Sequence, residues 1–244
     1  MQVAILHDSE HRRIWVSRTT NRMDHWVLDS SITNLVSTIY EQDPEFARRI
    51  VRGPIQTTLK QNPVDQALVQ IAAKRIRWEV LQAVLDQQIE IAKSQGYSVL
   101  EINSPPPALW QPGWNSEWGP SPSATDPSAI RAALTRAAEK IGTQQALLPR
   151  HARSRAVVAA LLGPEGRWLG CAANQNAQIR TQHAELSLLR GILEKSVGPL
   201  PLGCRLYVSL QPCKMCAAAA EFATQSPRDL PVTYYQRDPG AAAR

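Results

Sequence analysis

The sequence predicts an α/β domain in its carboxy-terminal half, preceded by a small α+β domain and joined to it by an extended connector. Apolar residues recur at helical spacing in some segments and at alternate positions in others, which indicates both helices and strands. Between residues 103 and 128 the chain carries seven prolines and three tryptophans with almost no regular period. We therefore expect domains at 1–102 and 126–244, with the connector at 103–125.

The amino-terminal part predicts a small sheet with helices. The clearest helix is expected from Asn62-Pro63, a cap residue followed by a first-turn proline, to Gly96. Apolar residues mark one face of it, and Lys74, Arg75 and Arg77 are interpreted as its solvated face. The remaining elements are short: strands at 3–6, 13–16, 25–28 and 97–102, and helices at 32–40 and 44–51.

The connector carries Trp110, Trp114 and Trp118 at four-residue intervals. Prolines at 112 and 120 prevent these tryptophans from forming one helical stripe. They could stack on bases or dock the connector onto the domains. We favour docking, which is the commoner role of buried aromatic residues.

The carboxy-terminal part alternates helices and strands. A helix is expected from Asp126-Pro127 to Gly142, followed by a hairpin of 156–162 and 167–173 around a Gly-Pro-Glu-Gly turn. Two helices then alternate with strands at 206–210 and 232–236. This order predicts three layers, with helices on both faces of one mixed sheet.

Residues that can bind a metal occur in two motifs, His183-Ala184-Glu185 and Pro212-Cys213-Lys214-Met215-Cys216. An imidazole and two thiolates are zinc ligands, whereas Glu185 is interpreted as a proton carrier. Three protein ligands leave a fourth position open, where zinc lowers the pKa of bound water to about 7. The motifs thus predict a catalytic Zn²⁺ site.

Both motifs are expected at helix starts. If Pro212 occupies the first turn of a helix, Cys213 and Cys216 lie on one face of that turn, at the positive end of the helix dipole. His183 likewise begins an apolar segment, 184–193. We expect the two helix starts to converge on the metal.

Other interpretations of the cysteines remain open. Cys213 and Cys216 could form a redox pair, although a His-x-Glu motif thirty residues upstream does not accompany such pairs. Cys171 or Cys204 could close a structural zinc site as a fourth ligand, but both are interpreted as small core residues. A decayed enzyme that keeps only the fold is a third alternative, and the retained Glu185 argues against it.

The motifs and their surroundings, from Asp126 to Gly240, resemble zinc nucleobase deaminases of the cytidine-deaminase-like superfamily. The likeness is greatest to the tRNA-specific adenosine deaminase branch. It implies a cytidine-deaminase-like fold in which His183, Cys213 and Cys216 hold zinc and Glu185 shuttles protons.

The resemblance also implies an asparagine that contacts the base after the second strand. Asn174 is at this place, and Asn176 is its rival because the gap from Asn174 to His183 is short. We further expect substrate contacts from Arg180, in the loop before His183, and from residues within and beside the motifs, namely Ala184, Gln211 and Pro212.

Relatives of this kind usually continue with a further helix and strand. We expect the amino-terminal domain or a homodimer partner to cover the surface which that continuation would cover.

The charge distribution favours a nucleic-acid substrate. Residues 126–244 carry 15 Lys and Arg against 8 Asp and Glu, a net +7, whereas residues 1–125 carry a net −1. Arg150, Arg153 and Arg155 are candidate phosphate contacts, and the alternative is that they are solvated surface charges. Together with the resemblance, the basic charge of residues 126–244 favours adenosine-to-inosine deamination in RNA. An enzyme with this activity is a hydrolase that acts on the C–N bond of a cyclic amidine.

Three other functions stay open. Cytosine in DNA or RNA is a close alternative substrate, and a free base or nucleoside is a third. The non-enzymatic alternative is a nucleic-acid-binding protein with a structural zinc. The sequence shows neither a membrane span nor a secretion signal, and four cysteines fit a reducing compartment, so we expect a cytoplasmic protein without a membrane partner.

Overall fold

The computed structural model describes residues 2–9, 11–19, 31–42, 54–57, 75–77, 80–102, 109–177, 181–196, 198–226 and 228–239. By internal contacts the chain divides into two compact units. One spans residues 1–106 together with 179–181, and the other spans the rest, so that residues 107 onward belong with the carboxy-terminal unit. Each unit has its own five-stranded sheet.

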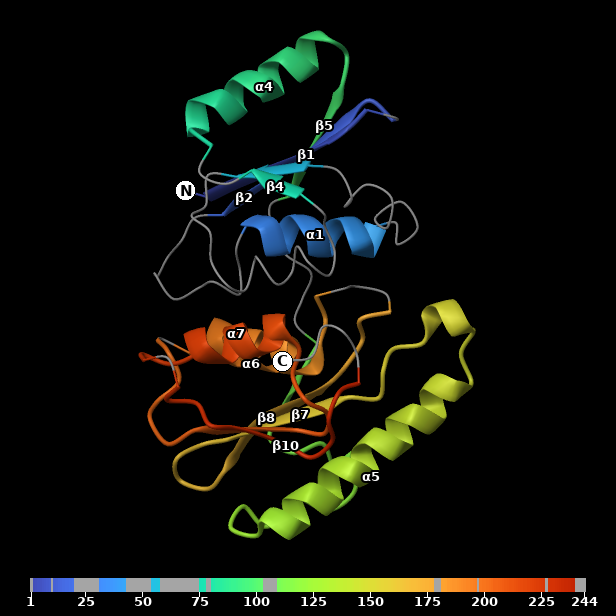
Figure 1. Cartoon of the computed structure of the whole chain (residues 1–244), viewed down its shortest axis with the longest axis vertical. Coiled ribbons are helices and arrows are strands. Elements are labelled where there is room, and N and C mark those ends of the chain that lie inside the picture. Colours follow the sequence, from blue (N-terminus) through green and yellow to red (C-terminus); the bar gives the residue numbers. More distant parts are fainter. Residues whose placement is uncertain are drawn as a thin grey trace. The chain divides into compact units, whose positions relative to one another are not determined.

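The amino-terminal unit is a sheet with a helix on each face (Figure 1). Its strands are β1 (Gln2–Asp8), β2 (Arg13–Thr19), β3 (Pro54–Thr57), β4 (Arg75–Arg77) and β5 (Ser98–Ile102), in the order β4-β3-β1-β2-β5. Alternate residues of β1 and β2, such as Val3 and Ile14, pack against α4 (Gln82–Ser94). Their neighbours Ala4 and Trp15 are also buried, and α1 (Ser31–Gln42) packs on these strands.

One prediction for this unit is wrong. A single helix was expected from 62 to 96, yet β4 interrupts that range and pairs in parallel with β3, so the helix α4 begins only at Gln82. Leu81, on the expected apolar stripe, is 72% exposed. Pairing with a strand distant in sequence outweighs local helical periodicity here. The expected elements at 25–28 and 44–51, and the first part of the expected helix, lie outside the described residues.

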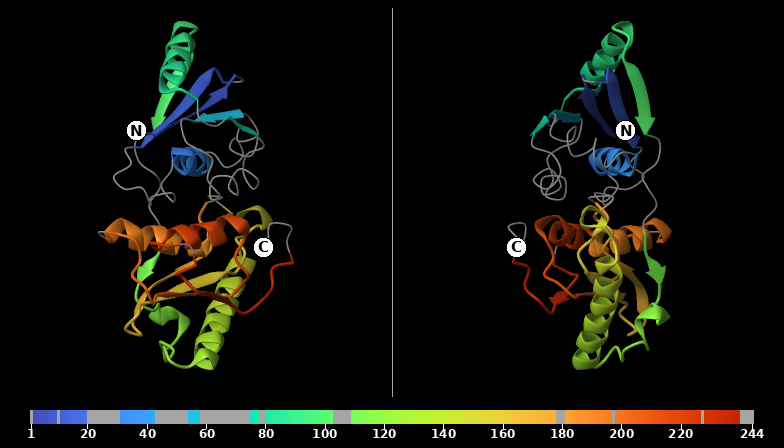
Figure 2. Two further views of the ribbon diagram at one scale, coloured as in Figure 1. Left: turned by 60° about the vertical axis from the view of Figure 1, so that its left-hand side comes forward. Right: turned by 90° about the vertical axis from the view of Figure 1, so that its right-hand side faces the viewer.

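The carboxy-terminal unit is a three-layer α/β structure, as predicted. Its sheet has the order β10-β9-β7-β8-β6, with β10 parallel to β9 and the other pairs antiparallel. The helix α5 covers one face, and α6 and α7 cover the other (Figures 1 and 2). The bounds are β6 (Gln111–Pro112), α5 (Pro127–Ala146), β7 (Val158–Leu162), β8 (Trp168–Ala173), α6 (Ala184–Lys195), β9 (Arg205–Val208), α7 (Lys214–Phe222) and β10 (Val232–Tyr234), with short 3-10 helices η2 (Ser116–Trp118) and η3 (Arg150–Ala152).

The helix α5 begins as its sequence predicts. The side chain of Asp126 accepts a hydrogen bond from the backbone N–H of Ser128 at 2.9 Å, and Pro127 opens the first turn. The apolar face of α5, which includes Ile130 and Leu134, packs on alternate residues of β7 in the main core. The hairpin of β7 and β8 also forms as predicted.

The tryptophan-rich segment packs on this unit. Trp114 makes an edge contact with Trp118 at 5.8 Å between ring centroids, and its ring lies 5.6 Å from that of Trp168 on β8. Trp110 lies against Gly170 of β8 and Gly191 of α6, where any side chain would collide with the indole. Two residues of the segment form β6, which adds a fifth strand to the sheet beside β8.

Across the part of the chain that the structure describes, no helix is both long enough and apolar enough to span a membrane.

Candidate metal centre

Two helices on the same face of the sheet begin at the predicted ligands. His183 is the N-cap residue of α6, and Cys213 is the N-cap residue of α7. Both have extended backbone angles, and neither side chain caps its own helix. Both side chains turn toward a common point instead, with Nδ1 of His183 3.5 Å from the sulfur of Cys213. Pro212 was expected inside the first turn of α7. It precedes the cap instead, because Cys213 takes the non-helical position.

The three ligand atoms lie close together. The Nδ1 atom of His183 is 3.5 Å from the sulfur of Cys213 and 3.5 Å from that of Cys216, and the sulfurs are 3.6 Å apart. A tetrahedral zinc ion with ordinary bond lengths separates two sulfurs by about 3.8 Å and a sulfur from a nitrogen by about 3.6 Å. The observed triangle therefore fits zinc in both size and donor type.

The thiols of this triangle differ in their protonation. The pKa of Cys213 falls to about 4, because its sulfur is hydrogen-bonded with Cys216 and lies beside the His183 ring. Burial raises the pKa of Cys216, and the neighbouring sulfur and carboxyl group act in the same direction. One thiolate is thus already favoured before a cation is added, and a cation would favour the second.

Glu185 is a buried carboxyl group beside the triangle. Its side chain is only 3% exposed, in the first turn of α6. Burial raises its pKa, whereas the His183 ring and hydrogen bonds with its own backbone and Cys216 lower it. Among the described residues, the cluster that could hold a metal contains His183, Cys213 and Cys216 but not Glu185. The carboxyl group is therefore near the ligands without being one of them.

Comparison with known families agrees with this arrangement. Residues 148–244 match the model of the Bd3614-like deaminase family. This part of the chain is a Bd3614-like deaminase domain. The matched range contains every residue of the metal centre, together with β7 to β10 and the helices α6 and α7.

Curated relatives match this chain over shorter stretches. A tRNA-specific adenosine deaminase from Agrobacterium fabrum is 36% identical over 73 residues, which are 29% of this chain and 48% of that protein. A tRNA(Ile)-lysidine synthase from Deinococcus deserti is 41% identical over 66 residues, which are 26% of this chain and 12% of that protein. The chain thus spans about half or less of these relatives.

Solved structures also resemble the chain. One comes from a study of A-to-I editing by tRNA:A34 deaminases at the wobble position of transfer RNA, with 31% identity, a TM-score of 0.35, and coverage of 45% of this chain and 75% of that chain. Another is a guanine deaminase from Nitrosomonas europaea, with 19% identity, a TM-score of 0.36, and coverage of 50% and 65%.

The loop between β8 and α6 of the deaminase domain carries both candidate base-contacting asparagines. Asn174 is 3% exposed, and its Nδ2 donates to Oδ1 of Asn176 at 3.1 Å. The Nδ2 of Asn176 is 3.4 Å from Nε2 of His183. Asn174 also lines a cavity of about 410 Å³ with Trp110, Trp118, Gln144, Gln145 and Ser154. Asn176 therefore lies beside the candidate metal ligand His183, and Asn174 lies beyond Asn176, at the cavity.

The other expected substrate contacts are dispersed. Ala184 is fully buried at the start of α6. Gln211 and Pro212 line a different cavity, of about 400 Å³, together with residues of α7 and β10. Arg180 lies outside the described residues. The structure thus brings the metal-binding motifs together, whereas Asn174 and Gln211 line two different cavities.

The remaining cysteines of the deaminase domain are core residues. Cys171 belongs to the apolar cluster under α5, and burial raises its pKa to about 11. Cys204 is also fully buried, and burial raises its pKa too. Neither joins the metal-binding cluster found among the described residues. These positions argue against a site closed by a fourth cysteine.

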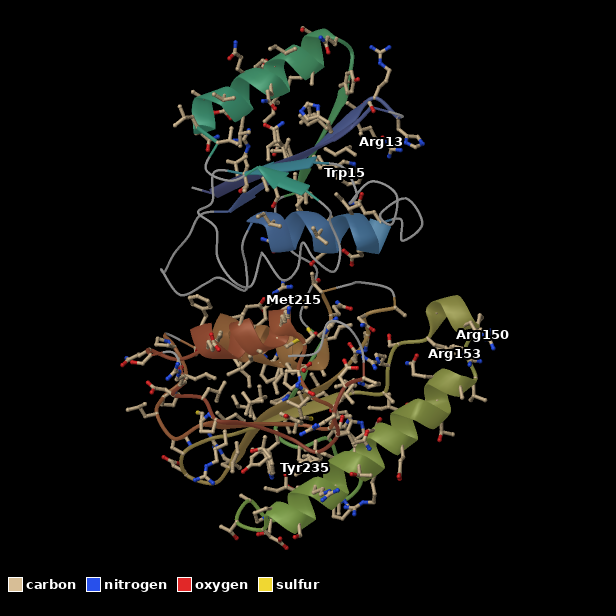
Figure 3. The ribbon with its side chains drawn as sticks, in the orientation of Figure 1. Arg13, Trp15, Arg150, Arg153, Met215 and Tyr235 are labelled. Carbon is tan, nitrogen blue, oxygen red and sulfur yellow. The ribbon has the colours of Figure 1, made fainter. Side chains whose placement is uncertain are left out.

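Two of the three arginines before β7, Arg153 and Arg155, bind groups of their own unit. Arg150 and Arg153 lie just beyond the carboxyl end of α5 (Figure 3), where Arg153 donates to the carbonyl oxygens of Ala146 and Leu148. Arg155 forms a paired hydrogen bond with both carboxylate oxygens of Asp238, at 2.7 and 2.8 Å. Nothing in the local sequence indicated Asp238 as a partner, because 83 residues separate the two.

Proposed function

We propose that this chain is a zinc-dependent nucleobase deaminase that converts adenosine to inosine in RNA. The observation that carries the proposal is the triangle of His183, Cys213 and Cys216 with a buried carboxyl group beside it. Three protein ligands with a free acid are the pattern of a catalytic zinc, whereas structural sites use four ligands. The match to the Bd3614-like deaminase family supports the same reaction class.

Zinc is the metal that the donor set favours. Two thiolates and one imidazole suit zinc better than magnesium or calcium, which prefer oxygen ligands. When bound in such a site, zinc supplies Lewis acidity and lowers the pKa of water to about 7. The ligands would come from two helix starts, so the orientation of α6 relative to α7 sets the geometry. A reducing, cytoplasmic compartment suits this proposal, because both cysteines must remain unoxidised.

Glu185 would move the protons of the reaction. Deamination replaces the exocyclic amine of the base by the oxygen of water, and ammonia leaves. A carboxylate beside the water accepts its proton, delivers one to the ring nitrogen, and then helps protonate the departing amine. Burial raises the pKa of Glu185, which brings its proton affinity closer to that needed near neutral pH.

Two observations support adenosine in RNA as the substrate. The Agrobacterium relative is named a tRNA-specific adenosine deaminase, and it is 36% identical to this chain over 73 residues. Residues 126–244 also carry a net +7 charge, which suits a polyanion. We further propose that Asn174 contacts the base, because it lines a cavity and its side chain is linked through Asn176 to the ring of His183. Arg153 and Arg155 already bind groups of the chain itself, so other basic residues would hold the phosphates.

The test is sequencing of nucleic acids after incubation with zinc-loaded protein. Total RNA, single-stranded DNA and double-stranded DNA would be scored for A-to-G and C-to-T changes, with release of ammonia measured in parallel. We expect A-to-G changes in RNA, and activity that falls steeply with added salt because phosphate contacts are electrostatic. C-to-T changes, or changes confined to DNA, would overturn the proposed substrate.

The matched variant is Glu185→Gln, which keeps the shape of the side chain and removes its acid. We expect zinc content to stay at one ion per chain, whereas the rate of ammonia release falls by at least about a hundredfold. Turnover retained in this variant would remove Glu185 from the proposed role. Zinc bound without any deamination of nucleic acid or free nucleoside would favour a structural metal site.

A further inference from the structure

The loop between β8 and α6 contains a chain of hydrogen-bonding groups that ends at a metal ligand. It runs from Nε2 of His183 to the amide of Asn176, at 3.4 Å, and from there to the amide of Asn174, at 3.1 Å. At its far end, Oδ1 of Asn174 is buried and has no hydrogen-bond partner within the described part of the protein. An unsatisfied buried amide atom is costly, and its presence beside a functional site calls for a partner.

Metal binding determines which groups donate and which accept in this series of hydrogen bonds. Nδ1 of His183 faces both sulfurs, so it is the nitrogen placed to bind the metal, and Nε2 must then carry the ring proton. A proton donor needs an acceptor opposite it. The amide of Asn176 can supply one only by presenting its oxygen, which a half-turn of the amide group achieves.

The same reasoning applies to the next amide. Once the oxygen of Asn176 faces His183, the NH₂ group of Asn176 faces Asn174. The side-chain oxygen of Asn174 must then accept a hydrogen bond from it. The NH₂ group of Asn174 then takes the position that now has no protein partner. Every group in the chain is satisfied except this last donor, on a residue that lines the 410 Å³ cavity.

The backbone around Asn176 is held on both sides. The N–H of Gln175 donates to the carbonyl oxygen of Gln182 at 2.9 Å, and that of Ala177 donates to Oγ of Ser154 at 3.0 Å. The N–H of Ser154 in turn donates to the side-chain oxygen of Gln145 on α5, at 2.8 Å. The loop is therefore built to keep the Asn176 amide in place beside the imidazole.

We propose that Asn176 is a positioning residue: its amide oxygen accepts the Nε2 proton of His183 and thereby fixes Nδ1 as the metal ligand. Its NH₂ group sets the orientation of Asn174, which then offers a hydrogen-bond donor to the substrate. The two asparagines thus have different roles, one toward the metal and one toward the base. This inference rests on the proposed function for the zinc ion and the substrate.

The first test measures zinc affinity by competition with a chelator, so that it needs no catalysis. We expect Asn176→Ala to weaken zinc binding on the order of 10- to 100-fold, as loss of a group that orients a ligand does. Asn176→Asp restores an acceptor for the Nε2 proton, and its affinity should return to within about threefold of the unaltered protein. Asn174→Ala and the matched surface control Gln175→Ala should leave zinc affinity unchanged.

Two outcomes would overturn the role of Asn176 at the metal. One is an Asn176→Ala protein that binds zinc as tightly as the unaltered protein. The other is an Asn176→Asp protein as weak as Asn176→Ala, since this would mean that the loop needs the asparagine for packing alone. Nitrogen-15 NMR of the unaltered zinc-loaded protein gives a readout without any variant. It should show His183 protonated at Nε2, and a proton on Nδ1 would contradict the inference.

The second test separates the metal role from the substrate role. In Asn176→Asp both side-chain oxygens are acceptors, one facing His183 and the other facing Asn174. Asn174 must then donate its NH₂ group to the aspartate and present its oxygen to the substrate. We expect KM for the RNA substrate to rise on the order of tenfold while zinc affinity is kept. An unchanged KM would exclude the link to Asn174. If the unaltered protein binds zinc with this dependence on Asn176 but releases no ammonia, the proposed function fails and the positioning role stands.

Discussion

Replacing Gly191 by alanine tests how the tryptophan-rich segment is attached to the deaminase domain. A Cβ atom at this position would lie 1.9 Å from Cδ1 and 2.0 Å from Nε1 of Trp110. Non-bonded carbon atoms need about 3.5 Å, so the indole would have to move by roughly 1.5 Å. The indole also packs closely on Gly170, where an added Cβ would lie only 2.8 Å from the ring, so it has little room to move on that side.

The magnitude follows from two opposing effects. Overpacking of this kind costs about 1–3 kcal/mol, whereas alanine in the interior of a helix is favoured over glycine by about 1 kcal/mol. We expect Gly191→Ala to lower the free energy of unfolding by up to about 2 kcal/mol, which is the overpacking cost less the helical gain. In a Trp110→Ala background the collision is absent, so the same substitution should raise it by about 1 kcal/mol.

The assay is urea denaturation of the four proteins of this double-mutant cycle, followed by circular dichroism. The expected coupling energy between the two positions is about 1–3 kcal/mol. Gly198→Ala is the matched control, because a Cβ there has no atom within 4 Å, and it should change stability by less than about 0.5 kcal/mol. Equal destabilisation by Gly191→Ala in both backgrounds would refute the contact with Trp110.

Two further predictions concern the cysteines and the start of α5. Alkylation at pH 8 should modify no cysteine of the folded, zinc-loaded protein and only Cys213 after zinc is removed, because the pKa of Cys213 is lowered to about 4 whereas Cys216 is buried and has a raised pKa. Cys171 has its pKa raised to about 11 and is buried, so mass spectrometry that found it modified in folded protein would contradict its place in the core. Asp126→Ala should lower the free energy of unfolding by about 1 kcal/mol, because it removes the hydrogen bond to the N–H of Ser128. Unchanged stability in urea denaturation would show that this cap contributes nothing.

The predicted elements of the carboxy-terminal unit were confirmed because their signals are local. Asp126-Pro127 marks a helix start through chemistry contained within three residues, and the hairpin of β7 and β8 follows from two apolar runs around a glycine-rich turn. The three ligand types could be named for the same reason, since imidazole and thiolate are themselves the signal. In the amino-terminal unit, the break between β4 and α4 was missed because β4 is held by a distant strand.

The sequence alone determined which kinds of side chain are present and where: which of them can bind a soft metal, which carboxyl group lies near them in the chain, and which segments favour helices. Only the tertiary structure decided which of these groups meet. It brought His183 within 3.5 Å of sulfurs thirty residues away, paired Arg155 with Asp238, and gave Asn176 rather than Asn174 the place beside the imidazole. The physical reason is that side-chain type is a local property, whereas a distance between two helix starts depends on how the whole sheet packs.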